Sequence, residues 1–200
     1  MSRDDILQTV KQNVAEFKPL PKYLKDTEQQ SAEKLKEIFI KYLKQVGAQF
    51  IELKSNEDIA PFIAEHFPGA FDFGKNDIWE EYSEYCPKEK LNQLETVMLE
   101  GQLGVAENGA IWLNDSDFPN RLIPFIAQQV IIKLDSDKIV SNMIEAYRKI
   151  NLENAGFGVF ISGPSKTADI EQSLVYGAHG PKELKVILYS REKTNSKNVR

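Results

Sequence analysis

The strongest sequence signals of the chain lie in residues 157–181, FGVFISGPSKTADIEQSLVYGAHGP. Residues 157–161 form an apolar strand candidate, and small and polar residues follow at 162–167. Residues 168–176 have the composition of a helix, with Thr167 as its candidate N-cap. A strand, a glycine-containing turn and a helix start would direct free backbone N–H groups and a helix dipole at one spot. The stretch therefore predicts an anion site; a capped helix start without a ligand is the equally supported alternative.

Several side chains of this stretch are candidate ligand-binding groups. Gly163 would let the backbone approach a ligand, and the hydroxyl groups would donate hydrogen bonds from Ser162, Ser165 and Thr167. Lys166 would add charge at the helix start, although a solvated lysine is the simpler interpretation.

The end of the same stretch supplies candidate catalytic groups. His179 precedes Gly180, and histidine is the side chain that titrates near neutral pH. Asp169 would repel an anion, so it is expected to cap the helix, orient His179 or hold a substrate hydroxyl. The alternative is that Asp169 and His179 only pin two turns together.

Residues 95–113, ETVMLEGQLGVAENGAIWL, predict two strands joined by a tight turn. Asn108-Gly109 is a strong hairpin signal between the apolar runs 103–106 and 110–113. Glu107 would stand at the mouth of that turn, either as a surface carboxylate or as a pocket residue. Because ligands gather outside the carboxyl ends of strands in α/β sheets, we expect Glu107, the 163–169 loop and the His179-Gly180 turn to converge on one cleft.

Arg121 is the notable cation of the polar loop 114–124. It would either pair with Asp115 or Asp117, or meet an anionic ligand through two parallel hydrogen bonds. The segment 74–95 interleaves aromatic with acidic residues, and a covering segment packed on the core is favoured there over a partner or ligand surface.

Alternation of helices and strands along the rest of the chain predicts an α/β fold, with a mostly parallel sheet of roughly five to seven strands between helices on both faces. The expected helices span 1–18, 27–47, 56–67 and 137–150, and the expected strands span 48–53, 70–73, 103–106, 110–113, 130–132, 157–161 and 184–189. Five strand residues are expected to be buried: Ile131, Val159, Ile161, Val186 and Ile187. The helix before the first prolines is expected to cover the domain's own sheet, or alternatively to dock on a partner chain.

Composition excludes several classes of function. The 200 residues carry a formal net charge of −5, which argues against a nucleic-acid-binding protein. No run approaches the roughly 18 apolar residues of a membrane span, and the charged N-terminus is unlike a signal peptide, so a cytoplasmic location is the expectation. Cys86 is the only cysteine and His66 and His179 are the only histidines, so we expect no metal site and no cofactor held by this chain alone. The chain also lacks a nicotinamide-binding glycine fingerprint and a P-loop.

The runs GPSKTADIE (163–171) and GAHGP (177–181) resemble the C-terminal signature of the lactate-utilization (LUD) domain family. The Ala-Glu-x-Gly unit at 106–109 is similar to a second family pattern, which commonly has Thr where this chain has Asn108 and Ala110. The resemblance covers roughly residues 28–190 in element order. It implies an α/β fold similar to coenzyme A transferases and ribose phosphate isomerases. The expected organisation is an N-terminal helical extension (1–26), the LUD-like domain (27–190) and a disordered basic tail (191–200).

The resemblance also implies a function. The family name comes from proteins needed to oxidise L-lactate to pyruvate, in which partner chains carry iron–sulfur clusters. A chain with one cysteine fits the cluster-free component of such an assembly, with a carboxylate-binding loop at 162–171. The alternative, by analogy of fold, is a stand-alone enzyme or binder of a phosphorylated or coenzyme A-like small molecule. Whether the isolated chain is an enzyme stays open at this point.

Overall fold

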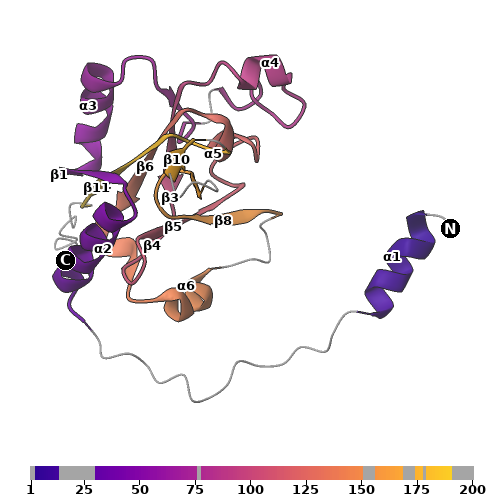
Figure 1. Cartoon of the computed structure of the whole chain (residues 1–200), viewed down its shortest axis with the longest axis horizontal. Coiled ribbons are helices and arrows are strands. Elements are labelled where there is room, and N and C mark those ends of the chain that lie inside the picture. Colours follow the sequence, from indigo (N-terminus) through magenta and orange to yellow (C-terminus); the bar gives the residue numbers. More distant parts are fainter. Residues whose placement is uncertain are drawn as a thin grey trace, which may run out of the picture.

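The computed structural model describes residues 3–13, 30–75, 78–150, 156–168, 174–177 and 179–190. Within them, two sheets and a separate hairpin form the β-structure, and most of the helices lie around the two sheets (Figure 1). The predicted tail at 191–200 and the N-terminal boundary at 26 lie outside the described residues.

A five-stranded sheet is central, and all of its neighbouring strands run parallel. In spatial order, its strands are β1 (Gln49–Leu53), β11 (Glu183–Tyr189), β6 (Gln129–Asp135), β3 (Thr96–Gly101) and β2 (Phe71–Asp72). The parallel sheet predicted from alternating strands and helices is therefore confirmed. Apolar runs with few polar interruptions explain its burial, because strands covered on both faces need apolar side chains on both sides.

A second, four-stranded sheet packs against the first. Its strands, in spatial order, are β7 (Ile139–Val140), β4 (Leu103–Val105), β5 (Ala110–Asn114) and β8 (Gly158–Ile161). β4 and β5 are antiparallel and are joined by the predicted turn, where Gly109 has φ +66°. β8 pairs antiparallel with β5. Sequence periodicity did not indicate that these strands leave the parallel sheet.

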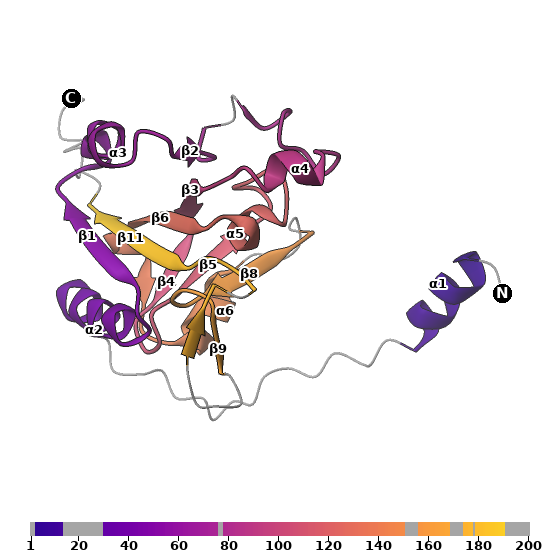
Figure 2. The same ribbon diagram turned by 45° about the horizontal axis from the view of Figure 1, so that its top comes forward.

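Helices pack on both faces of the parallel sheet and on the far face of the second sheet. The α-helices are α1 (Arg3–Gln12), α2 (Ala32–Gln45), α3 (Ile59–His66), α4 (Lys88–Leu91), α5 (Ile123–Ile126) and α6 (Met143–Lys149), and the 3₁₀ turns are η1 (Asn56–Asp58) and η3 (Ser136–Lys138). Ser31 caps α2 by accepting a hydrogen bond from the backbone N–H of Lys34. Figure 2 shows α3 and α2 on opposite sides of the parallel sheet.

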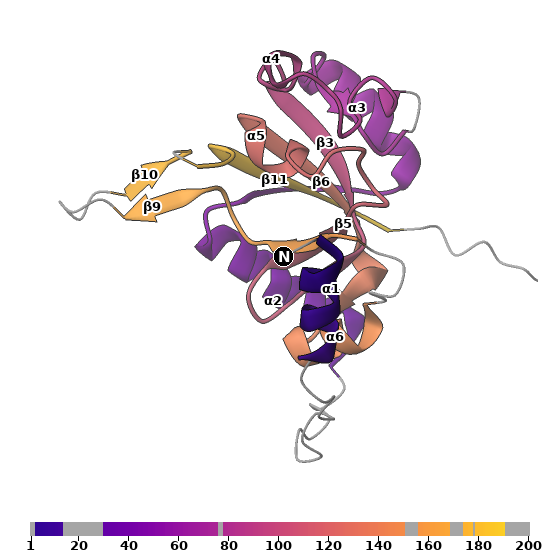
Figure 3. The same cartoon turned by 90° about the vertical axis from the view of Figure 1, so that its right-hand side faces the viewer.

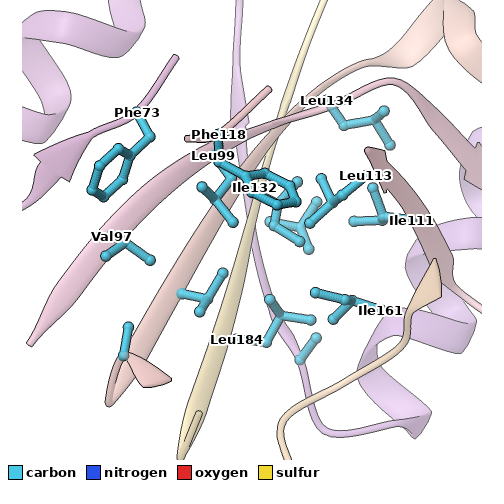
Figure 4. Close-up of a cluster of buried hydrophobic side chains, with 14 of the residues drawn as sticks. Phe73, Val97, Leu99, Ile111, Leu113, Phe118, Ile132, Leu134, Ile161 and Leu184 are labelled. Carbon is cyan, nitrogen blue, oxygen red and sulfur yellow. The ribbon is translucent and has the colours of Figure 1, made fainter. Parts of the chain in front are cut away.

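The side chains of the central strand, β6, point alternately into two buried clusters. On β6, Val130, Ile132 and Leu134 face the second sheet, whereas Ile131 faces α3 together with Ile59 and Ile63. Figure 4 shows side chains of both sheets meeting in the larger cluster. The far face of the second sheet packs on α6. From one side to the other, the layers are therefore α3, the parallel sheet, the second sheet and α6.

The burial predictions hold at four of the five strand positions. Ile131, Ile161, Val186 and Ile187 are buried, and Val159 is partly buried. Val159 lies on β8, which pairs with one strand only and forms an edge of the second sheet.

The helix predicted at 168–176 is wrong for its described residues. Lys166–Ala168 forms β9 and Leu174–Tyr176 forms β10, an antiparallel pair with Val175 opposite Thr167. Val, Tyr and Thr prefer strands, and the backbone N–H of Gly177 closes the base of the hairpin by donating to the Ser165 carbonyl (3.0 Å). Figure 3 shows this pair extending away from the two sheets.

Two further helix predictions need correction. The helix expected at 137–150 begins only at Met143, because Ile139–Val140 joins the second sheet as β7. Helix α1 leaves Ile6 and Leu7 about half exposed, so within the described residues it does not cover the sheet as expected. In the acidic segment, Tyr82 is buried and packs edge-on against Phe73, as a covering segment should.

Candidate functional site

The two glycine-containing runs at 162–165 and 177–181 lie side by side. The backbone N–H of Ser165 donates to the Pro181 carbonyl (2.9 Å), and the N–H of Gly177 donates to the Ser165 carbonyl. A Cβ placed on Gly180 would lie 3.0 Å from Ser165 Cβ, so glycine permits this close approach. The backbone therefore joins two segments that are separate in the sequence.

These runs line a pocket of about 250 Å³. Its polar lining comes from Ser162, Ser165 and the exposed His179. The rest of the described lining is glycine and apolar side chains: Pro124, Phe125, Phe160, Ile161, Gly163, Pro164, Gly180 and Pro181. The structure thus brings together five of the predicted site residues, which are Ser162, Gly163, Ser165, His179 and Gly180.

The pocket lies at a different sheet end from the expected one. It follows the carboxyl end of β8, but β8 belongs to the second sheet. Relative to the parallel sheet, the pocket lies beside the amino ends of β11 and β6. There the backbone N–H of Lys182 donates to the Gln128 carbonyl (2.8 Å). The expectation of a cleft outside the carboxyl ends of the parallel strands is therefore wrong for this pocket.

Gly163 and Lys166 hold the loop against the end of α2. Gly163 has φ +77°, and a Cβ there would lie 2.4 Å from the carbonyl oxygen of Val46. The ammonium of Lys166 donates to the same oxygen (2.5 Å), at the helix end that attracts cations. Both residues therefore hold the loop on the end of α2, whether or not a ligand binds.

Gly109 also serves packing. Its turn lies against α2, and a Cβ there would be 3.0 Å from the backbone nitrogen of Leu43. The Ser162 hydroxyl donates to the Asn108 carbonyl (2.8 Å), which ties the turn to the start of the pocket loop. Gly109 itself does not line the pocket.

Glu107 points away from this pocket, so the predicted convergence of Glu107 with His179 is wrong. Its Oε1 accepts a hydrogen bond from the backbone N–H of Met143 (2.8 Å) at the start of α6. It lines a separate hollow of about 220 Å³ together with Ser141 and Asn142. The free N–H groups of a helix start attract a carboxylate, which accounts for this orientation.

Arg121 also lies elsewhere. It pairs with Asp115 (3.1 Å), which is the structural alternative expected from the sequence, and its guanidinium lies over the ring of Phe157 (5.6 Å). It lines a larger hollow of about 760 Å³ between the acidic segment and the 115–122 loop, to which Cys86 also contributes. A nearby carboxylate and a nearby ring explain why Arg121 does not reach the pocket at 162–165.

A protein-family model, the LUD domain, matches residues 75–189, which is more than half of the chain. The chain belongs to the LUD domain family. Lactate utilization protein C of Bacillus pumilus is 37% identical over 38% of this chain and 35% of its own length. An uncharacterized protein of Neisseria meningitidis is 36% identical over 43% of this chain and 38% of its own length. The chain therefore matches little more than a third of the length of these curated relatives.

A solved structure shares the fold of this LUD-domain chain. It is a DUF162 family protein from Deinococcus radiodurans, with a TM-score of 0.61 and 18% sequence identity. The similarity covers 81% of this chain and all of that protein. It supports the α/β architecture described above.

The structure describes no side chain for two residues of the LUD signature. Asp169 is outside the described residues, and Thr167 is described in its backbone only. Their predicted roles, including the orientation of His179 by Asp169, stay predictions.

Sequence interpretation missed two pocket walls of this LUD domain, Phe125 on α5 and Phe160 on β8. Phe160 directly precedes Ile161 on a strand whose side chains alternate, and Ile161 was expected to be buried. That alternation does not single out Phe160 as a pocket residue, because Ile161 lines the same pocket. Phe125 had no signal either, because apolar runs are ordinarily interpreted as core.

The described part of this LUD domain holds no group of three or more His, Cys, Asp or Glu side chains suited to a metal ion. Within the same residues, no helix has both the length and the apolar character needed to span a membrane.

The start of α6, beside Glu107, is stabilised by a second carboxylate. Glu145 Oε2 accepts hydrogen bonds from the Ser141 backbone N–H (2.8 Å) and hydroxyl (3.0 Å), and Asn142 Oδ1 accepts from the Glu145 N–H (2.9 Å). The Ser141 N–H, with its hydroxyl adding to the effect, lowers the pKa of the Glu145 carboxyl below its ordinary value. This stabilisation is present above the unfolded-state pKa and is lost as pH falls through the folded-state pKa.

Glu145→Gln is expected to lower the free energy of unfolding by about 1 kcal/mol at pH 7, the usual loss for a helix cap. The difference from the wild type should shrink as pH falls below about 4.5, the ordinary pKa of this group, because the wild-type carboxylate is then protonated as well. Urea unfolding between pH 7 and pH 3 measures it. Glu37→Gln, at an exposed ion pair with Lys34, is the control and should change stability little. A difference that stays constant down to pH 3 would contradict the role given to the Glu145 charge.

Proposed function

We propose that this chain is a lactate-utilization protein, acting as a component without its own iron–sulfur cluster in an assembly that oxidises L-lactate to pyruvate. The pocket formed by the two signature runs binds the substrate. The observation that carries the proposal is the joining of these runs at Ser165 and Pro181 around one small pocket. The names of the curated relatives support the link to lactate.

The lining suits a small hydroxy acid. The Ser165 hydroxyl and the imidazole of His179 donate hydrogen bonds to the substrate carboxylate. The Ser162 hydroxyl donates to the Asn108 carbonyl, so its oxygen accepts a hydrogen bond from the substrate hydroxyl. The described lining contains no Lys or Arg side chain, so hydrogen bonds carry more of the binding than charge does.

Conversion of lactate to pyruvate releases two electrons and two protons. The single cysteine, Cys86, cannot ligate a cluster by itself, so partner chains with iron–sulfur clusters accept the electrons. This chain binds and orients the substrate, and His179 accepts the hydroxyl proton as a general base. The Cα–H bond breaks as the C=O bond forms, and its proton and the two electrons pass to the partner chains. Asp169 is assigned the orientation of His179 in this proposal.

The volume of the pocket favours a small acid over a coenzyme A-like ligand. Pockets for drug-sized ligands usually enclose about 300–1,000 Å³, and this pocket has about 250 Å³. Competition with inorganic phosphate tests the phosphorylated alternative.

His179→Gln is expected to weaken L-lactate binding about tenfold or more, because it changes a hydrogen bond to a charged ligand. Calorimetry with L-lactate, using acetate and inorganic phosphate as competing probes, measures the change. In a strain lacking this gene, the variant should restore growth on lactate poorly.

The other histidine provides a matched control. His66 lies on α3, is exposed and stacks on Phe62, so His66→Gln should bind and complement like the wild type. Circular dichroism checks that both variants are folded. The proposal fails if folded His179→Gln binds lactate and supports growth as well as His66→Gln does, or if the wild type prefers phosphate to lactate.

A further inference from the structure

Exposed apolar side chains gather in two places on this chain. Within the described residues, six large apolar side chains are exposed: Ile6, Leu7, Tyr85, Leu122, Phe125 and Tyr147. The first two lie on α1, the next two line the larger hollow, and Phe125 follows on α5. Single apolar residues on a surface need no explanation, whereas adjacent ones mark interaction sites. One chain therefore carries two apolar surfaces that are open to a partner.

The first surface is the apolar face of α1. Ile6 is 50% exposed and Leu7 is 44% exposed, and neither belongs to the buried clusters described above. Asp5 and Gln8 lie on the opposite side of the helix, because successive helical residues are about 100° apart. Figures 1 and 2 show α1 apart from the two sheets. A helix of 10 residues is marginal in water without tertiary packing, so α1 needs a surface to pack on.

The second surface is the larger hollow. Leu91 and Phe118 line it and are buried, each at 1% exposure. Tyr85 and Leu122 line it as well, but they are 86% and 48% exposed, so part of its apolar lining remains in contact with solvent. An apolar hollow of about 760 Å³ on the surface suits the apolar face of an amphipathic helix.

The two segments that form the hollow are fixed to each other. The side-chain amide of Asn120 donates to the Ser83 carbonyl (2.9 Å), and its oxygen accepts from the Leu122 backbone N–H (3.0 Å). A partner therefore meets a formed surface and does not have to order it. Leu122 leads into α5, whose Phe125 lines the substrate pocket, so a helix in the hollow would lie near that pocket.

The charges of the two surfaces can be matched. Both signs occur on each: Arg3, Asp4 and Asp5 on α1, and Glu80, Glu84, Lys88 and Arg121 on the hollow. Complementary charges around an apolar contact fix the orientation of a docked helix more than its affinity.

A second copy of the chain supplies the partner for each surface. In the single chain both surfaces stay open (Figure 1). Residues 14–29 join α1 to the residues before α2, and a chain of this length spans at most about 53–58 Å, which reaches a neighbouring copy. An exchange in which each copy gives its α1 to the other closes with twofold symmetry and makes every contact twice.

We propose that α1 of one copy docks through Ile6 and Leu7 into the larger hollow of a second copy, and that the reciprocal contact holds the protein as a dimer. This inference does not depend on the ligand of the substrate pocket. Because the contact joins two chains, changes on α1 should alter the dimer and leave the stability of the monomer unchanged.

Light scattering of the full chain over a dilution series measures the dimer. Ile6→Glu and Leu122→Glu should each weaken dimer formation at least about tenfold, because each places a charge in an apolar contact. Gln8→Glu, on the opposite side of α1, is the matched control and should dimerise like the wild type. A wild type that is monomeric throughout the series, or a dimer that both apolar-face variants leave intact, overturns the proposal.

Cys86 is the only cysteine and lines the hollow, so it reports the docked helix directly. In Ile6→Cys or Leu7→Cys, oxidised glutathione should produce a covalent dimer through a disulfide between the new thiol and Cys86 of the other copy. Gln8→Cys should crosslink much less, and adding Cys86→Ser to Leu7→Cys should abolish the crosslink. A disulfide within one chain, a covalent dimer that persists without Cys86, or no crosslink from either apolar-face position would each overturn the proposal.

Discussion

Gly163→Ala is expected to destabilise the protein by about 2–4 kcal/mol, combining backbone strain with overpacking. Gly163 has φ +77°, a conformation that residues with a Cβ rarely adopt. The new methyl group would also meet the carbonyl oxygen of Val46 at 2.4 Å. Because that atom belongs to the backbone at the end of α2, it cannot rotate away. The free energy of unfolding, measured in urea for the wild type and the variant, tests this expectation.

Gly69→Ala is the control for this substitution. A Cβ added at Gly69 would have no atom within 4 Å, and Gly69 has no positive φ, so alanine should change stability by less than about 0.5 kcal/mol. The double variant Gly163→Ala, Val46→Ala should remain destabilised, because removing the Val46 side chain leaves its carbonyl in place. Wild-type stability in Gly163→Ala would mean that the pocket loop does not pack on the end of α2.

The parts of the fold that sequence predicted well are those with strong local signals. The apolar runs in β6 and β11 predicted buried parallel strands, and Asn108-Gly109 predicted the β4–β5 turn. Ser31, a residue type preferred at helix starts, caps α2. Each of these signals depends on the preferences of a few adjacent residues, which tertiary packing did not override.

The hairpin formed by β9 and β10 was mistaken for a helix because its local composition is ambiguous. Thr167, Val175 and Tyr176 favour strands, whereas the acidic and amide residues between them are compatible with a helix. The hydrogen bond from Gly177 to Ser165 decides between the two, and it depends on how the chain closes on itself.

Sequence predicted only part of the candidate site, because tertiary packing decides where some of its residues lie. Ser165 and His179 could be paired from their signature runs, and the structure places both on one pocket. Glu107 could not be assigned correctly, since its partner Met143 is supplied by the start of α6. Phe125 reaches the pocket only because α5 lies beside β8, an arrangement that no single segment of sequence specifies.

Ile132→Ala is expected to lower the free energy of unfolding by about 2–5 kcal/mol, the usual cost of truncating a fully buried isoleucine. Ile132 is 0% exposed on β6, the central strand of the parallel sheet. Its side chain lies in the cluster shared with Ile111 and Leu113 of the second sheet (Figure 4). Equilibrium unfolding in urea measures the loss, and Ile6→Ala on the exposed face of α1 is the control with an expected change of less than about 0.5 kcal/mol.

The neighbouring residue makes this a test of the layered architecture. Ile131 is also 0% exposed, but it faces α3 on the other side of the same strand. If both faces of the parallel sheet are covered, Ile131→Ala and Ile132→Ala should each cost about 2–5 kcal/mol, and Ile132→Val should cost about 0.5–1.5 kcal/mol. A loss below about 1 kcal/mol for Ile132→Ala, beside a full loss for Ile131→Ala, would contradict the packing of the second sheet on this face. Because β8 of that second sheet carries Phe160 and leads into Ser162, the same result would also remove the support on which the pocket depends.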